Sequence, residues 1–193
     1  MASASRAPID TRSGFCPSES IFYSKRKPVD FPSDPHLDVT TFISSRRHSG
    51  TIALIDASTG RRVAYTELWG FTASVSCALS STYHVRKGDV VLLLSPNSIY
   101  FPIVSLAVMS LGAILTTTNP LNTAREISNQ IADSSPVLAF TTRTLLPKLS
   151  ATFLNLPIVL LEDSRSADED PGVVSTIQDL ISTSPQPRRA ALQ

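Results

Sequence analysis

The sequence predicts an α/β fold in which helices flank a layered, mostly parallel β-sheet. The main observation is an alternation of strand-like and helix-like segments over residues 90–161. A second observation is that residues 90–94 are apolar at every position, as is typical of a strand covered on both faces. Strands that alternate with helices in this way are best accommodated in parallel layers.

Three segments are expected along the 193 residues. Residues 1–35 carry five prolines and no sustained periodicity, which predicts an irregular N-terminal arm. Residues 36–163 carry the strand and helix patterns and are expected to form a partial α/β domain. Residues 164–193 are polar and interrupted by proline, so we expect a polar tail, with a short helix near residues 173–181, and a domain that is truncated there.

The partial domain is expected to begin with a short helix and a β-hairpin. Residues 37–47 predict the helix, with apolar side chains at positions 39, 42 and 43. Two strand-like segments, residues 51–56 and 62–65, flank the turn-forming sequence Ala-Ser-Thr-Gly. This arrangement predicts the hairpin.

The pattern changes to a helical period after the hairpin. Thr66 is placed to cap this helix, and its apolar face is formed by Leu68, Phe71, Val75, Ala78 and Leu79. Cys77 falls on the apolar side, so we expect it to pack in the core.

The next segments are the turn 87–89, the strand 90–94, a buried helix near 98–111 and the strand 113–117. Residues 99–115 are almost uniformly apolar and approach the length of a membrane span. However, Pro102 lies in the first turn of the helix, and Gly112 interrupts the apolar run. We therefore expect a helix buried in a protein core, and no membrane span.

The sequence Asn119-Pro120 is expected to end that strand. Thr123 and Glu126 have the spacing of a capping box, and the helix behind them presents Ile127 and Ile131 to the core. Two further strands are expected at 137–141 and 158–161. They flank a helix that is marked by apolar residues at positions 145, 149 and 153.

Composition and charge exclude several classes of function. The formal net charge is +1, from 17 basic and 16 acidic residues, and the basic clusters are short, so no nucleic-acid partner is expected. The two cysteines form no C-x-x-C motif, which favours a reduced, soluble intracellular protein. No targeting signal is expected: the N-terminus lacks an apolar central run, and the last residues, Ala-Leu-Gln, differ from a peroxisomal Ser-Lys-Leu signal.

The distribution of glycine excludes the common phosphate-binding loops. No two of the seven glycines are closer than ten residues, which rules out G-x-G-x-x-G and G-x-x-x-x-G-K-[ST]. The triplet 49–51, Ser-Gly-Thr, predicts a turn before a strand. His36, His48 and His84 are isolated and are expected to be exposed or hydrogen-bonded. The residues alone therefore predict no catalytic residue, no cofactor-binding residue and no metal ligand.

Three stretches resemble a known family. They are residues 63–68 (VAYTEL), residues 85–91 with 94–98 (VRKGDVV and LSPNS), and residues 111–120 (LGAILTTTNP) followed by Glu126, Ile127 and Gln130. Their order and spacing resemble those of plant 4-coumarate–CoA ligases and their peroxisomal acyl-activating relatives. These proteins belong to the AMP-dependent synthetase and ligase (adenylate-forming) superfamily. The resemblance implies an incomplete N-terminal domain of the adenylate-forming fold.

The resemblance also implies a reaction. A small carboxylic acid, such as a hydroxycinnamate, a fatty acid or a jasmonate precursor, attacks the α-phosphate of Mg·ATP and releases pyrophosphate. The thiol of CoA then displaces AMP to give a thioester. The family places this chemistry on a phosphate loop ending in Lys-Gly and on a mobile C-terminal domain, and neither has a match in residues 1–193. We therefore expect this chain to be inactive alone and to bind ATP, Mg and CoA only weakly.

An alternative remains open for the chain. It can act as a non-catalytic interaction fragment that associates with a full-length ligase, because an unfinished domain is expected to expose strand edges that invite pairing. By resemblance, the chain is expected in the peroxisome or the cytoplasm.

Overall fold

The structure is a computed structural model, and it describes residues 9–27, 30–150, 156–162 and 172–182. The chain divides into two compact units, with the boundary between Pro35 and His36. Each unit is described by itself.

The first unit contains a small β-hairpin. Strands β1 (Phe15–Cys16) and β2 (Ile21–Phe22) pair in antiparallel fashion, and the rings of Phe15 and Phe22 lie 4.9 Å apart between centroids. Cys16 is fully buried. The expectation of a wholly irregular arm is therefore wrong at these residues. Two-residue strands are too short to show an alternating pattern, and the ring contact that holds them together joins residues seven positions apart.

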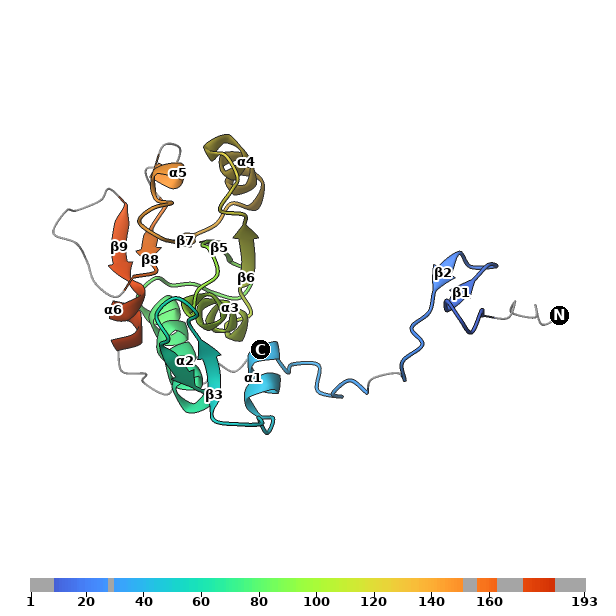
Figure 1. The fold of residues 1–193 in the computed structure, drawn as a ribbon. Helices are drawn as coiled ribbons and strands as arrows, with labels where there is room; N and C mark the ends of the chain where they lie inside the picture. The colour runs from blue at the N-terminus through green and yellow to red at the C-terminus, as the bar shows by residue number, and fades with distance from the viewer. Residues whose placement is uncertain (1–8, 28–29, 151–155, 163–171, 183–193) are drawn as a thin grey trace. The chain divides into compact units, whose positions relative to one another are not determined.

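The second unit is built on a five-stranded parallel sheet, which confirms the predicted fold class. In spatial order its strands are β6 (Ile114–Thr118), β5 (Val90–Leu94), β7 (Leu138–Thr141), β8 (Ile158–Leu160) and β9 (Val173–Thr176). Every neighbouring pair is parallel. Strands β6 and β9 lie at the two ends of this sheet (Figure 1).

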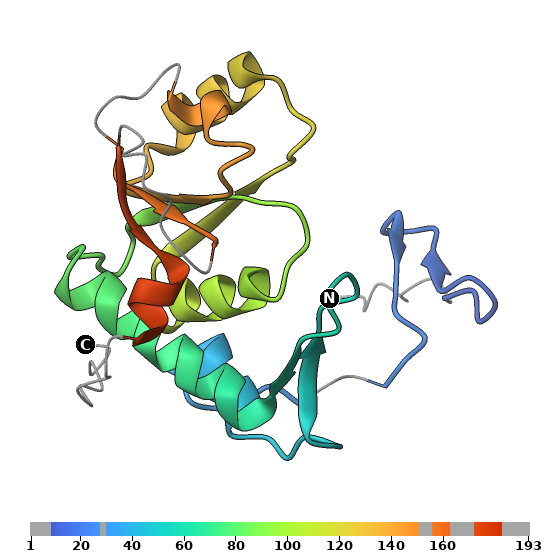
Figure 2. The same ribbon diagram turned by 60° about the vertical axis from the view of Figure 1, so that its left-hand side comes forward.

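Helices cover both faces of the sheet, as Figure 2 shows. Val91 and Leu93 of β5 belong to the core cluster under α2 (Tyr65–Ser81), α3 (Tyr100–Ser110) and α6 (Ile177–Ser182). Leu92 and Leu94 belong to a second cluster under α4 (Ala124–Ser134) and α5 (Pro147–Ser150). The four residues 91–94 are fully buried, so the expectation of a strand covered on both faces is confirmed.

A short helix and a hairpin precede these layers. Strands β3 (Ile52–Ile55) and β4 (Arg62–Ala64) pair in antiparallel fashion, which confirms the predicted hairpin. Helix α1 (Val39–Ser44) forms as expected, and the Asp38 side chain accepts a hydrogen bond from the Thr41 N–H.

Two of the three apolar side chains of α1 are exposed, and the third, Phe42, is half-buried. Val39 is 52% exposed and Ile43 is 37% exposed, whereas Thr40 is buried. The Thr40 hydroxyl donates to the Leu106 carbonyl of α3 at 2.7 Å. The side of α1 that carries Thr40 therefore lies against α3.

Helix α2 begins two residues earlier than predicted. Strand β4 leads directly into it, with Ala64 at the N-cap, and the Glu67 carboxylate accepts from the Ala64 N–H at 2.7 Å. Thr66 is therefore not the cap. Cys77 is only half-buried, because the core positions on this helix are taken by the fully buried Val75 and Leu79.

The passage from α3 to β6 depends on Gly112. Its φ is +67°, and its N–H donates to the Met109 carbonyl at the end of α3. Strand β6 then begins at Ile114. Helix α3 has 11 residues, and among the described residues no helix is long and apolar enough to cross a membrane.

The capping box at the start of α4 is confirmed. Glu126 N–H donates to the Thr123 hydroxyl, and the Glu126 carboxylate accepts from the Thr123 N–H at 2.8 Å. Hydrogen bonds to the Glu126 carboxylate lower its pKa from the ordinary value of 4.5. The hydrogen bond from the Thr123 N–H has the largest effect, and the one from the Thr123 hydroxyl follows. Ile127 and Ile131 are buried on the inner face, as expected.

Thr123→Ala is expected to lower the free energy of unfolding by about 1 kcal/mol, because it removes the N-cap acceptor. The pKa of Glu126 is lower in the folded state than in the unfolded state, so the hydrogen bonds that its carboxylate accepts stabilise the fold fully above pH 4.5 and are lost as the pH falls through the folded pKa. The hydrogen bond from the Glu126 N–H to the Thr123 hydroxyl does not depend on this titration. Urea denaturation across this pH range should show a difference between wild type and variant that shrinks on acidification only by the share of the hydrogen bond from the Thr123 hydroxyl to the Glu126 carboxylate, because the variant keeps the backbone N–H. Asn129→Ala, at an exposed position of the same helix, should change stability by less than about 0.5 kcal/mol at every pH. A pH-independent difference would contradict this account.

The end of the described chain corrects the expected polar tail. Residues 173–176 form β9 rather than a helix, and α6 follows over residues 177–182. Strand β9 pairs with β8, and Ile177 and Leu180 are buried in the core. The backbone groups of residues 173–176 form hydrogen bonds with β8. The expectation of a helix failed because the local sequence pattern does not show that β8 lies beside this segment. Helix α5 is a single turn, and the expected position 153 lies outside the described residues.

Candidate functional site

The strand order creates one distinctive point in the sheet. The chain passes from β5 through α3 to β6 on one side, and then through α4 to β7 on the other side of β5. The connections after β5 and β7 therefore diverge at the carboxyl ends of these two adjacent strands. In open parallel sheets, ligands characteristically bind outside the carboxyl ends of the strands at such a switch point. We call this region the switch edge and define it by residues 95–98, 119–122, 141–144 and 162.

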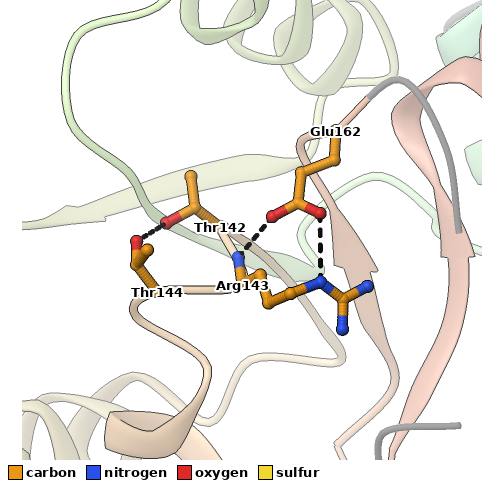
Figure 3. Close-up of polar contacts among 4 residues, drawn as sticks. All are labelled: Thr142, Arg143, Thr144 and Glu162. Carbon is orange, nitrogen blue, oxygen red and sulfur yellow. Dashed lines mark hydrogen bonds and ion pairs between the residues drawn. The ribbon is translucent and has the colours of Figure 1, made fainter. Parts of the chain in front are cut away.

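Polar residues on the β7 side of the switch edge form two hydrogen-bonded pairs, shown in Figure 3. The Glu162 carboxylate, just after β8, accepts from the Arg143 N–H at 2.8 Å and pairs with the Arg143 Nε at 3.3 Å. The hydroxyls of Thr142 and Thr144 lie 3.0 Å apart. Glu162 thus ties the loop after β7 to the loop after β8, and about a third of each ion-pair side chain remains exposed.

The β5 side presents a serine and asparagine loop. The Ser95 hydroxyl donates to the Pro96 carbonyl at 2.7 Å, and Asn97 is exposed. The hydroxyl oxygens of Ser98 and Thr141 are buried without a hydrogen-bond partner among the residues that the structure describes. Buried hydroxyls normally have hydrogen-bond partners, so these two oxygens are unusual, and Thr141 is 0% exposed.

A groove extends from this loop toward the hairpin. It encloses ≈ 380 Å³ and is lined by residues 54–58 and 97–99. On the hairpin side, the Asp56 carboxylate accepts from the hydroxyl and N–H of Ser58 and the N–H of Thr59, and these hydrogen bonds lower its pKa. Arg61 Nη1 donates to the Tyr100 hydroxyl at 2.8 Å and so joins the hairpin to α3.

The loop after β6 is held by a lysine from α5. Lys148 Nζ donates to the carbonyls of Pro120 and Asn122, at 2.6 and 2.8 Å. The Asn119 side chain accepts from the Leu121 N–H, which confirms the turn expected at Asn119-Pro120. The segments after β6 and β7 are therefore fixed to one another at the same end of the sheet.

The switch edge has the chemistry of a binding surface. It offers hydroxyls, amides, a guanidinium and a carboxylate. Among the described residues, no group of three His, Cys, Asp or Glu side chains comes together to hold a metal ion. The absence of catalytic, cofactor and metal residues therefore stays a prediction, and the switch edge is a candidate for positioning a ligand.

The three histidines lie away from the switch edge. His36 and His84 are exposed. His48 is half-buried and stacks on Tyr65 at 4.1 Å between ring centroids, and its Nε2 has no hydrogen-bond partner in the described part of the chain. The His48 ring thus packs by stacking on Tyr65. It is neither exposed nor hydrogen-bonded to a described residue through Nε2, which differs from the expectation.

Comparison with known protein families gives the decisive observation. The family model of the AMP-binding enzymes matches residues 42–190. The chain belongs to the AMP-binding enzyme family. This match includes the hairpin, the whole parallel sheet and the switch edge.

Individual members of the AMP-binding enzyme family resemble the chain strongly. It is 55% identical to "Probable CoA ligase CCL5" of Humulus lupulus, over 98% of the chain and 34% of that protein. It is 63% identical to "Peroxisomal OPC-8:0-CoA ligase 1" of Arabidopsis thaliana, over 82% of the chain and 29% of that protein. The chain thus spans about a third of the length of the curated relatives that it matches, and its resemblance to 4-coumarate–CoA ligase-like proteins is confirmed.

Solved structures give the same fold for this AMP-binding enzyme chain. An anthranilate CoA ligase, AuaEII, in complex with anthranoyl-AMP matches 81% of the chain and 30% of its own length, with a TM-score of 0.66 and 18% identity. The luciferase-like enzyme of the Zophobas morio mealworm matches 82% of the chain and 39% of its own length, also with a TM-score of 0.66 and 18% identity. The predicted fold, part of an adenylate-forming enzyme, is therefore confirmed.

Most of the residues that carry the family resemblance lie outside the switch edge. Two of their loops, which are named below, are part of it. Residues 63–68 join β4 to α2, Gly112 lies in the turn after α3, and residues 114–118 build β6. Residues 95–98 and Asn119-Pro120 do reach the edge. Arg143 and Glu162 were missed, because 19 residues separate them and nothing in the sequence links two polar side chains at that distance.

Proposed function

We propose that this chain is the N-terminal portion of an ATP-dependent carboxylic acid–CoA ligase and forms one wall of its ligand site. The observation that carries the proposal is the 63% identity to a CoA ligase over 82% of the chain. The switch edge supports it, since its polar loops lie where parallel sheets commonly bind ligands. The proposed substrates are small carboxylic acids, either 4-coumarate-like acids of phenylpropanoid metabolism or fatty-acid and jasmonate-precursor-like acids.

The isolated chain lacks the kind of glycine-rich loop that binds the phosphates of ATP. A loop that cradles phosphates needs closely spaced glycines so that several backbone N–H groups converge on the anion. The glycines of this chain are nowhere closer than ten residues. We therefore assign ATP, Mg and CoA to the complete ligase and propose that the isolated chain binds none of them tightly and is inactive.

The role proposed for the residues of this chain is positional. Glu162 and Lys148 hold three loops at one end of the sheet. The peroxisome or the cytoplasm is the proposed location of the complete ligase, and the similarity to a peroxisomal relative supports the former.

A second candidate function is that of a non-catalytic interaction fragment that associates with a full-length ligase. The observation that favours it is that β6 and β9 each pair with a single strand in the described residues. Co-purification of the tagged chain with a full-length relative would support this function. An inert monomer in the same experiment would count against it.

Release of pyrophosphate tests the proposed inactivity. The 193-residue chain, incubated with ATP, Mg, CoA and a panel of hydroxycinnamic and fatty acids, is expected to release no more pyrophosphate than a protein-free blank. A full-length relative serves as the positive control. Turnover by the isolated chain would overturn the inactivity.

A chimera tests the ligase assignment separately. Residues 36–182 should replace the corresponding segment of a full-length relative without loss of acyl-CoA formation. A folded, soluble chimera that is inactive on every acid of the panel would contradict the assignment, whatever the isolated chain does.

A further inference from the structure

The loop between α1 and β3 carries a charge pattern that the proposed ligase function does not use. Arg46 and Arg47 stand three and two residues before Ser49. The chain contains three pairs of adjacent arginines, and only this pair has a serine or threonine two residues after its second member. Residues 39–55 contain no acidic residue, so the charge along the chain on both sides of Ser49 is positive only.

The structure leaves the Ser49 hydroxyl accessible. Residues 46–51 form neither helix nor strand and join α1 to β3 (Figure 1), and Ser49 is exposed. Its side chain has no hydrogen-bond partner among the residues that the structure describes. The next residue, Gly50, is also exposed, and a Cβ there would meet no atom within 4 Å. The space around the serine is therefore open.

The two arginines before Ser49 are exposed as well. The Arg46 guanidinium lies 4.3 Å from the centroid of the Phe42 ring, and neither Arg46 nor Arg47 forms an ion pair through its side chain within the described part of the chain. His48, between Arg47 and the serine, stacks on Tyr65 of α2. The His48 side chain thus holds the loop against the domain, while the side chains on either side of it remain accessible.

We propose that Ser49 is a phosphorylation site for a serine/threonine protein kinase that selects arginine at the third and second positions before the serine. Protein kinases choose substrates by such charge patterns, and guanidinium groups pair with carboxylates in a forked geometry that an acidic substrate cleft provides. The Ser49 hydroxyl oxygen attacks the γ-phosphorus of the Mg·ATP that the kinase holds. The bond from this phosphorus to the bridging oxygen breaks, ADP leaves, and the hydroxyl proton passes to the catalytic aspartate of the kinase.

Phosphorylation changes the sign of the charge added to this surface. A phosphoserine adds about 1.5 to 2 negative charges at pH 7. Residues 39–55 contribute two positive charges, both from the arginines beside Ser49. The modification therefore offsets the positive charge of the loop. This site is independent of the ligase function proposed above.

Phosphate transfer to the 193-residue chain tests the site. The chain is incubated with Mg·ATP and an arginine-directed kinase, the catalytic subunit of cyclic-AMP-dependent protein kinase. We expect one phosphate per chain by intact-mass spectrometry, located on Ser49 by peptide fragmentation. Ser49→Ala should abolish this incorporation. Ser128→Ala should leave it unchanged, because Ser128 follows Arg125 at the same spacing but lies inside α4 and has Glu126 two residues before it. No incorporation into wild type, or incorporation at another residue, overturns the proposal.

Two kinetic comparisons separate recognition of the arginines from exposure alone. Arg47→Gln should lower kcat/KM for phosphorylation by about tenfold or more, because one charged hydrogen-bonding group is lost. Arg62→Gln, in an arginine pair with no serine after it, should behave like wild type. Equal values for Arg47→Gln and wild type would overturn the proposal.

A synthetic peptide of residues 43–52 provides the reference for accessibility. The folded chain should reach at least about one tenth of the kcat/KM of the peptide, a factor that corresponds to reordering the backbone of about one residue. A folded chain that is slower than the peptide by more than this factor would show that the fold withholds Ser49 from the kinase, and would overturn the proposal.

Discussion

Phe140→Ala is expected to lower the free energy of unfolding by about 3–5 kcal/mol. Phe140 is a fully buried residue of β7 and is among the largest side chains with no exposed surface. It stands between Leu93 of β5 and Val159 of β8 in register, and all three belong to the cluster under α2, α3 and α6. Truncation removes the ring and leaves a cavity in the middle of the sheet, which its neighbours can fill only partly.

Urea denaturation followed by circular dichroism measures this loss, and Phe31→Ala is the matched control. Phe31 is 88% exposed, so its truncation should change stability by less than about 0.5 kcal/mol. Similar losses for the two variants would mean that β7 is not the centre of the core. The substitution should not change the slope of the transition with urea, since the surface exposed on unfolding stays nearly the same.

Substitution of two glycines by alanine is expected to have opposite effects. Gly112 has a φ of +67°, and a Cβ there would lie 3.1 Å from Cγ of Lys87. Gly112→Ala should therefore cost about 1–2 kcal/mol, because the left-handed conformation is unfavourable for any residue with a Cβ. Gly70 lies inside α2, and a Cβ there would meet no atom within 4 Å. Gly70→Ala should stabilise the chain by about 0.5–1 kcal/mol, because alanine loses less conformational freedom in a helix.

The two glycine variants are compared by thermal and urea unfolding under one set of conditions. Each provides the other's control, since the chemical change is the same and only the backbone conformation differs. A stabilising Gly112→Ala would show that the turn between α3 and β6 does not require a positive φ. A destabilising Gly70→Ala would show that the surface of α2 near this residue is occupied.

Local signals in the sequence were sufficient for most elements. The apolar run 90–94, the hairpin around residues 56–61 and the capping box at Thr123 each concern residues that are close in the chain, and each is confirmed. The wrong predictions concern residues whose burial or secondary structure depends on a contact with a part of the chain that is distant in sequence. Thr40 is buried because it reaches the Leu106 carbonyl, and residues 173–176 become a strand because β8 is beside them.

The sequence by itself determined the α/β class, the positions of most core strands and helices, the family resemblance and the lack of a glycine-rich phosphate loop. Only the tertiary structure decided the strand order, and with it the switch edge and the ion pair between Arg143 and Glu162. The physical reason is that periodicity and capping reflect interactions within a few residues. Strand order, in contrast, depends on which buried faces and backbone groups satisfy one another across the whole sheet.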